Sequence, residues 1–252
     1  MSGARFSIAA TSRGRGRIAA EIALSLYDHM QQAGLPQISL ALGTGDSELG
    51  GLSAPVVVAK KKYDLGFSNP AGLARMALLG RGLYREKLPL RAIGVFPSWD
   101  RVVFAVRPET GIRSLKEIAD KKYPLRVSTR KEGRFQTTLF AISEVLKAHG
   151  FSFAEMEKWG GKILRVSNPG SSERADHIQK GEADAIFDEG IKSWGARALA
   201  SGMRFLPIGE EVLRRLEKMG FQGAPVTSLH YPELREEITT LDFSGWVLLC
   251  HR

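Results

Sequence analysis

Apolar residues follow two alternating patterns along the chain. Short apolar runs such as 6–10, 38–42 and 63–67 end in turns rich in Gly, Ser, Thr and Asn, which is typical of buried strands. Between them, apolar residues recur at helical spacing, as in 17–32. Strands that alternate with helices predict βαβ units and a mainly parallel sheet.

The same alternation returns after residue 108 and predicts a second α/β lobe. A Ser114–Glu117 capping box begins a helix there, and the runs 125–128, 163–167 and 183–187 indicate strands. We therefore predict an α/β fold of two lobes, with mainly parallel sheets and a ligand cleft between the lobes. Lobe one comprises residues 1–97 plus 226–252, and lobe two comprises residues 98–225.

Composition adds exclusions and one preference. The chain has 252 residues, of which 43% are hydrophobic and 25% charged, as in ordinary globular proteins. Its single cysteine excludes an internal disulfide and a cysteine-cluster metal site. No apolar run approaches the roughly 20 residues that span a bilayer. The net charge of +9 favours anionic partners, but the basic residues are dispersed, so nucleic acid is not indicated.

Candidate ligand-binding residues lie in the turns that follow the predicted strands. Open α/β sheets bind ligands at the carboxyl ends of strands, where a helix N-terminus offers free N–H groups to an anion. The candidates are Ser12, Arg13, Gly45 and Asn69 in lobe one, and Trp99, Thr129, Arg130, Arg134 and Asp188 in lobe two. The alternative is that the small polar residues only cap helices and the arginines are solvated surface charges.

Among the candidates, the arginines indicate the kind of ligand most directly, because a guanidinium holds a carboxylate through two parallel hydrogen bonds. We expect Arg130 and Arg134, with Thr129, to hold a ligand carboxylate from lobe two. Trp99 either stacks on the ligand or packs between the lobes. Asp188 either shapes the site, where it could bind a ligand amine, or caps the helix that follows it.

Common enzyme motifs are missing from the sequence. It contains no GxSxG, HExxH or P-loop pattern. Gly14 and Gly16 begin a dinucleotide fingerprint, but Ala19 stands where its third glycine would be. We therefore assign no catalytic residue, cofactor or metal, and favour a binding protein over an enzyme.

Six short motifs follow one another in the order and spacing of a known family. They are Gly43–Ser47, Tyr63–Phe67, Ser114–Ala119, Arg126–Thr129, Gly181–Phe187 and Phe205–Ile208. This series resembles the solute receptors of TRAP transporters, TAXI family, which have the type II periplasmic-binding-protein fold. The resemblance implies a solute held between two lobes that close by hinge motion, a membrane transporter subunit as partner, and a periplasmic location.

The chain also departs from that family. Thr11–Arg15 replaces a glycine-rich turn, which favours an anionic ligand. No apolar leader precedes the first strand, so we expect a cytoplasmic location if the chain is complete. The chain stops at Trp246–Arg252, before the family's C-terminal helices, and we expect apolar surface on lobe one that a partner or a second copy would cover.

The favoured hypothesis is capture of a small carboxylate, for TRAP-type uptake or for ligand sensing. The first alternative is a cytoplasmic decarboxylase of an aromatic acid, because dihydroxyphthalate decarboxylases resemble this fold; it requires a His or Lys in the cleft. The second alternative is an effector-sensing module that acts through a partner. A DNA-binding helix-turn-helix is expected in such regulators, and the sequence has none.

Overall fold

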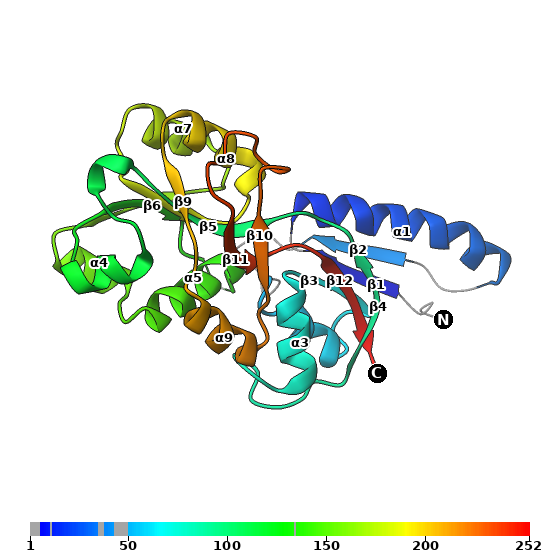
Figure 1. The fold of residues 1–252 in the computed structure, drawn as a ribbon. Coiled ribbons are helices and arrows are strands. Elements are labelled where there is room, and N and C mark those ends of the chain that lie inside the picture. The colour runs from blue at the N-terminus through cyan, green and yellow to red at the C-terminus, as the bar shows by residue number, and fades with distance from the viewer. Residues whose placement is uncertain (1–5, 11, 35–37, 43–49, 134) are drawn as a thin grey trace. The chain divides into compact units, whose positions relative to one another are not determined.

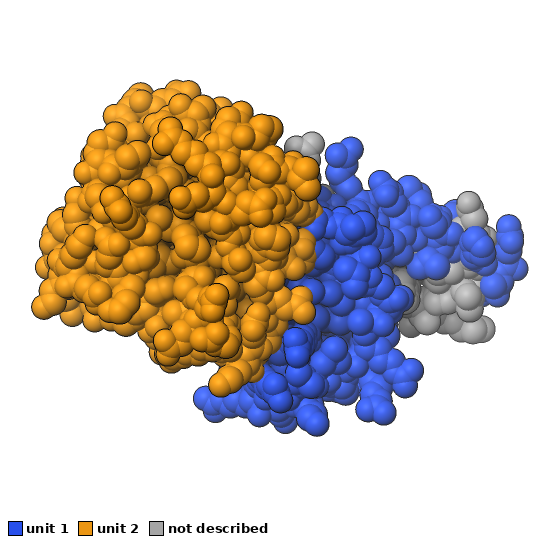
Figure 2. All heavy atoms as spheres, viewed as in Figure 1, with its two compact units in different colours: residues 1–98, 133–137, 245–252 blue, residues 99–132, 138–244 orange. Residues whose placement is uncertain are grey.

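Two mixed sheets organise the chain, one in each of two units (Figures 1 and 2). The computed structural model describes residues 6–10, 12–34, 38–42, 50–133 and 135–252. Unit 1 comprises residues 1–98, 133–137 and 245–252, and unit 2 comprises residues 99–132 and 138–244. Both units have the α/β organisation that the alternating sequence pattern predicts.

Unit 1 has a sheet with a parallel centre. Its elements are β1 (Phe6–Ala10), α1 (Arg13–Gln32), β2 (Ile38–Leu42), α2 (Ala54–Ala59), β3 (Leu65–Ser68), α3 (Ala71–Leu79), β4 (Leu90–Phe96) and β12 (Trp246–His251). The strand order is β2-β1-β3-β12-β4, in which β1 runs parallel to β2 and β3. The C-terminal strand β12 is antiparallel to both β3 and β4.

Helices cover both faces of the unit 1 sheet. Leu65 and Phe67 of β3 pack in one apolar cluster with Ile18 and Ile22 of α1. Gly66 lies between them and faces the opposite side, since successive side chains of a strand alternate. A Cβ on Gly66 would stand 2.7 Å from a methyl group of Val58 in α2. The glycine thus permits α2 to approach the sheet closely.

Unit 2 contains the larger sheet. Its elements are β5 (Arg101–Val106), a 3-10 turn (Pro108–Thr110), α4 (Leu115–Lys121), β6 (Arg126–Arg130), α5 (Thr137–Ala148), α6 (Phe153–Lys158), β7 (Lys162–Val166), α7 (Ser172–Gln179), β8 (Ala185–Asp188), α8 (Ile191–Ala200), β9 (Arg204–Leu206), α9 (Glu210–Met219), β10 (Gly223–Val226) and β11 (Ile238–Asp242). The strand order is β10-β11-β5-β8-β6-β7, and β9 pairs with β5. Strands β6, β7 and β8 are parallel, and β5 is antiparallel to β8.

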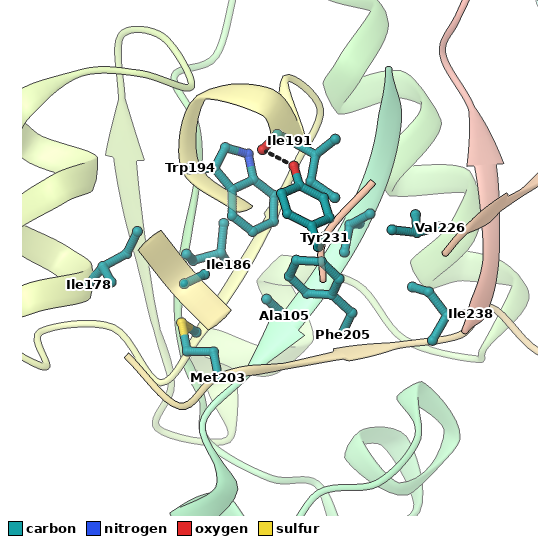
Figure 3. Packing of buried hydrophobic residues seen from close by; sticks show 12 residues of the cluster. Ala105, Ile178, Ile186, Ile191, Trp194, Met203, Phe205, Val226, Tyr231 and Ile238 are labelled. Atoms are coloured by element: carbon teal, nitrogen blue, oxygen red, sulfur yellow. Dashed lines mark hydrogen bonds between the residues drawn. The ribbon is translucent and has the colours of Figure 1, made fainter. Parts of the chain in front are cut away.

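The core of unit 2 gathers side chains from strands and helices that are distant in sequence. Figure 3 shows Trp194 of α8 beside Phe205 and Tyr231, and all three are buried. Tyr231 donates its hydroxyl to the carbonyl of Ile191 at 2.7 Å, so its polar end is satisfied inside this apolar cluster. Burying each such side chain contributes roughly 1.5–3 kcal/mol. This cluster fixes the start of α8, which borders the site described below.

The second crossing between the units differs from the predicted boundary. The chain returns to unit 1 at Gly245 rather than at residue 226. The reason is β11, which pairs with β10 and β5 and so keeps residues up to Ser244 in unit 2. Pairing between strands is a long-range property that the local pattern does not encode.

A second difference concerns residues 133–137, which group with unit 1 although they follow β6. The amide of Leu52 donates to the carbonyl of Phe135 at 3.3 Å. Gly50 permits this approach, because a Cβ there would overlap Phe135 and stand 2.9 Å from its carbonyl oxygen.

The predicted helix cap at Ser114 is confirmed. The Ser114 hydroxyl accepts a hydrogen bond from the amide of Glu117 at 3.3 Å.

Candidate functional site

The unit 2 sheet has a topological switch point between β6 and β8. The connection after β6 leads to β7 on one side, and the connection after β8 leads to β9, which pairs with β5 on the other side. Ligands of open α/β sheets bind outside the carboxyl ends of such strands. Arg130 ends β6 and Asp188 ends β8, and β5 begins at Arg101 on the same edge because it is antiparallel.

An ion network fills this edge. Asp188 is fully buried and accepts Arg174 Nη2 at 2.7 Å and Arg130 Nε at 3.4 Å. Its other oxygen accepts the amide of Glu189 at 2.8 Å. The second arm of the Arg130 fork reaches the carboxylate of Glu189. A carboxylate that accepts at both oxygens from two arginines and a backbone amide serves as the structural anchor of the edge.

Burial and ion pairing shift the pKa values of these groups in opposite directions. Burial raises the pKa of Asp188, and Arg130 and Arg174 oppose that rise. Burial alone would lower the pKa of Arg130, but Asp188 and Glu189 outweigh it and the pKa is raised. Burial lowers the pKa of Arg174, with a partial offset from Asp188. Arg130 is therefore the more firmly charged of the two guanidinium groups.

Arg174 has hydrogen-bonding capacity that the fold does not use. It lies in the first turn of α7 and is only 1% exposed. Its Nε and Nη1 atoms have no hydrogen-bond partner within the described part of the chain. Buried N–H groups are nearly always paired with protein, water or ligand. These two N–H groups are therefore donors for which the described part of the fold supplies no acceptor.

Two carboxyl groups meet beside the network. Asp100 Oδ1 accepts the amides of Arg101 and Gly190 at 2.8 and 2.9 Å. Gly190 adopts a left-handed φ of +70°, and a Cβ there would stand 2.5 Å from Pro169. Burial, then the charge of Glu189 and a hydrogen bond with it, raise the pKa of Asp100 to about 8.

Aromatic and basic side chains border the same edge. Trp99 stacks on His230 with ring centroids 4.3 Å apart. The Lys192 ammonium lies 5.6 Å from the Trp99 ring centroid, and the Arg101 guanidinium lies at the same distance. The indole N–H of Trp99 is buried and has no hydrogen-bond partner among the residues described. Trp99 thus packs within unit 2, and its indole N–H has no acceptor among the described residues.

Unit 1 has a switch point of its own between β1 and β3. The connection after β1 leads to β2 on one side, and β3 lies on the other. Ser12 follows the carboxyl end of β1, and its hydroxyl caps α1 by accepting the amide of Arg15 at 3.4 Å. Ser68 ends β3, and its buried hydroxyl has no partner among the described residues. The buried Asn69 follows it.

The predicted residues fall into three groups. In unit 2, Arg130 and Asp188 are in contact and Trp99 lies at the same edge, whereas the Thr129 hydroxyl is buried and donates to the carbonyl of Phe187 at 2.7 Å. In unit 1, Ser12 and Asn69 both lie at the switch point, and Arg13 is the first residue of α1. Gly45 and Arg134 lie outside the described residues. The ligand-binding assignments stay predictions.

Three residues at this edge are not among the predicted site residues. They are Asp100, Arg174 and His230. Arg174 carried a usable signal: it lies in the first turn of a helix that follows a strand, where anions bind. The pairing of Asp100 with Glu189 left no signal in the sequence, because strand order brings together residues that are far apart in the sequence.

Other chemistry is poorly supported in the described ranges. They hold no group of three His, Cys, Asp or Glu side chains that could bind a metal ion. Ser128 Oγ lies 2.8 Å from His177 Nδ1, and Ser128 is fully buried. Among the same residues no helix is long and apolar enough to cross a bilayer.

Comparison with known proteins identifies the fold. No protein-family model and no curated protein matches the chain. Among solved structures, the glycine betaine/L-proline-binding protein of an ABC transporter from Borrelia burgdorferi is similar at 15% identity and a TM-score of 0.53. The match covers 98% of this chain and 75% of that one. The chain has the two-unit α/β fold of the periplasmic solute-binding proteins.

Two further solved structures match the chain with lower TM-scores. The LysR substrate-binding domain of a periplasmic protein from Wolinella succinogenes has 12% identity and a TM-score of 0.48, over 98% of this chain and 86% of that one. A TRAP periplasmic solute-binding protein from Rhodobacter sphaeroides has 9% identity and a TM-score of 0.43, over 98% and 70%. At these identities the similarity concerns the fold, and the TAXI resemblance stays a prediction.

Proposed function

We propose that this chain is a solute-binding protein for a small carboxylate. The observation that carries the proposal is the buried Arg174 guanidinium at the unit 2 switch point, with two N–H groups that no described residue accepts. A carboxylate suits these donors, because hydrogen bonds between a guanidinium and a charged oxygen are stronger than those between neutral groups. Its charge would also offset the burial that lowers the pKa of Arg174.

Further donors at the same edge support this choice. The indole N–H of Trp99, which no described residue accepts, and the ammonium of Lys192 belong to the same group of side chains. Lys192 is on the first turn of α8, where the helix N-terminus favours negative charge.

The comparisons support a transport or sensing role for such a site. The similar Borrelia burgdorferi protein binds glycine betaine and L-proline, and both solutes carry a carboxylate. We propose use in uptake through a membrane transporter of the TRAP type, in the periplasm, with ligand sensing as the other outcome. Fractionation of cells that express the full gene, followed by immunodetection, tests the location.

The decarboxylase alternative has one observation in its favour. It requires a His or Lys at the site, and His230 and Lys192 both flank Trp99. The ring of His230 already accepts the amide of Thr227 at 3.1 Å, and burial lowers its pKa, so it is neutral near pH 7. Recovery of a bound acid distinguishes the two functions, because decarboxylation releases CO2 and a binding protein returns the acid unchanged.

A thermal-shift screen tests the proposal. Dicarboxylates, amino acids, keto acids and aromatic acids are each added to the purified protein. A solute present at 100 times its Kd adds about 2.7 kcal/mol to the free energy of unfolding. We expect at least one acid to raise the melting temperature.

A matched pair of variants locates the effect. Arg130→Ala is expected to remove the shift, measured from the melting temperature of that variant without solute. Arg126→Ala is the control, since Arg126 lies at the start of the same strand and pairs with Asp184. Arg130→Lys keeps the charge but loses the fork, and is expected to weaken the shift. If no acid moves the melting temperature, or if the Arg126 variant loses the shift equally, the proposal is wrong.

A further inference from the structure

The carboxyl groups of Asp100 and Glu189 interact although both are acidic, so an ion pair cannot explain the contact. Asp100 Oδ1 is occupied by the amides of Arg101 and Gly190, at 2.8 and 2.9 Å. The Asp100 carboxyl also forms a hydrogen bond with the Glu189 side chain. Two carboxylates have no donor between them, so this contact requires one proton.

Neighbouring groups decide where that proton resides. The Arg130 fork donates to the Glu189 side chain. Among the described residues no guanidinium donates to the Asp100 side chain; the Arg101 guanidinium donates instead to the Asp100 backbone carbonyl at 2.7 Å and to Asp242 at 2.9 Å. This arrangement favours Asp100 as the carrier of the proton. Burial and the charge of Glu189 raise its pKa to about 8.

This single proton determines the charge of the whole edge. The charged and titratable groups packed around it are Arg101 and Asp242 on β5 and β11, Arg130 on β6, Arg174 on α7, Asp188 and Glu189 at the end of β8, Lys192 on α8, and His230 and Tyr231 between β10 and β11. Burial lowers the pKa of His230 and raises that of Tyr231, so both are neutral from pH 7 to 9. In this set the cations outnumber the carboxylates by one while Asp100 is neutral, and they are equal once Asp100 ionises.

We propose that Asp100 and Glu189 share one proton at neutral pH, and that this proton controls anion binding at the unit 2 edge. The protonated pair accepts an anionic solute, and the ionised pair rejects it. This inference rests on the proposed function, because it concerns how the same site is regulated. If binding requires the proton, affinity falls about tenfold between pH 7 and pH 9.

The first experiment needs no solute. A group whose pKa is raised in the folded state contributes stability at low pH that is lost as pH rises through that value. The wild-type protein should therefore lose melting temperature between pH 7 and pH 9. Asp100→Asn supplies an amide N–H in place of the shared proton and cannot ionise, so it should lose markedly less. Asp184→Asn, the same substitution immediately before β8, should follow the wild type.

The second experiment measures binding by calorimetry, at constant ionic strength and at pH 7 and 9. Succinate, 2-oxoglutarate and benzoate are the probes, since none changes charge in this range. We expect binding by wild type and Asp184→Asn to weaken about tenfold at the higher pH. In Asp100→Asn the ratio of the two affinities should be about one, because no proton is lost there.

The outcomes separate this inference from the proposed function. Equal pH dependence of stability in wild type and Asp100→Asn overturns the shared proton, whatever binds. A stability difference with binding that is independent of pH retains the pair and overturns its control of the solute. A stability difference with no binding of any probe at either pH retains the pair; together with a thermal-shift screen in which no acid acts, it overturns the proposed function and the regulation with it.

Discussion

The buried contact between Arg174 and Asp188 gives the sharpest test of how unit 2 is held together. Arg174 is 1% exposed and Asp188 is 0% exposed, with 2.7 Å between Nη2 and Oδ2. Arg174→Met keeps much of the side-chain volume and removes the charge. Asp188 then depends on Arg130 alone, whose Nε lies at 3.4 Å.

Two effects of opposite sign determine the size of the loss. Removing one partner of a buried ion pair costs about 3–5 kcal/mol. The wild type already carries two buried donors on Arg174 without a described partner, and each such group costs about 1–3 kcal/mol, which the substitution relieves. At about 1 kcal/mol for each of the two donors the relief is about 2 kcal/mol, so we expect a net loss of about 1–3 kcal/mol in the free energy of unfolding at pH 8.

The pH dependence identifies the charge as the cause. Burial raises the pKa of Asp188, and removing Arg174 removes one of the groups that oppose this rise. In the variant Asp188 takes up a proton more readily in the folded state. Stability from a raised pKa is present at low pH and lost as pH rises, so the variant should lose less at pH 5 than at pH 8.

Urea denaturation followed by far-UV circular dichroism measures this loss at both pH values. Circular dichroism is preferred to fluorescence, because the Arg174 guanidinium lies 6.0 Å from the Trp194 ring. Arg214→Met is the control: its partner is Glu210, the two side chains are 66% and 91% exposed, and the loss should stay within about 0.5 kcal/mol. An equal loss at pH 5 and pH 8, or no loss, would refute the reasoning.

Two further predictions concern unit 1. Gly50→Ala should destabilise the protein by about 1–3 kcal/mol, because the added Cβ would overlap Phe135; Gly94→Ala, with nothing within 4 Å of its Cβ, should be close to neutral by the same thermal denaturation. Ser68→Ala removes a buried hydroxyl without a described partner, so the melting temperature should stay or rise. A clear drop in melting temperature would show that this hydroxyl has a partner in the folded protein.

The local pattern of the sequence determined the helices and strands, and it predicted the candidate site at the carboxyl ends of the strands. Burial of one helix face or of a whole strand imposes a period on nearby residues, so α1 and the strands β1, β2 and β3 are predictable from their own segments. Turn chemistry is local as well. It correctly placed Ser114 as a helix cap, and it directed attention to Arg130 and Asp188 at the ends of strands.

The tertiary structure decided how those residues are used. Arg130 is paired with Asp188 and Glu189, which lie 58 and 59 residues further along the chain. The proton on Asp100 and the return to unit 1 at Gly245 likewise depend on which strands are neighbours. Strand order is set by packing between distant segments, and charge is set by burial and by the partners that packing supplies. Neither strand order nor the charge of a buried group produces a periodic pattern in the sequence, so neither can be predicted from that pattern.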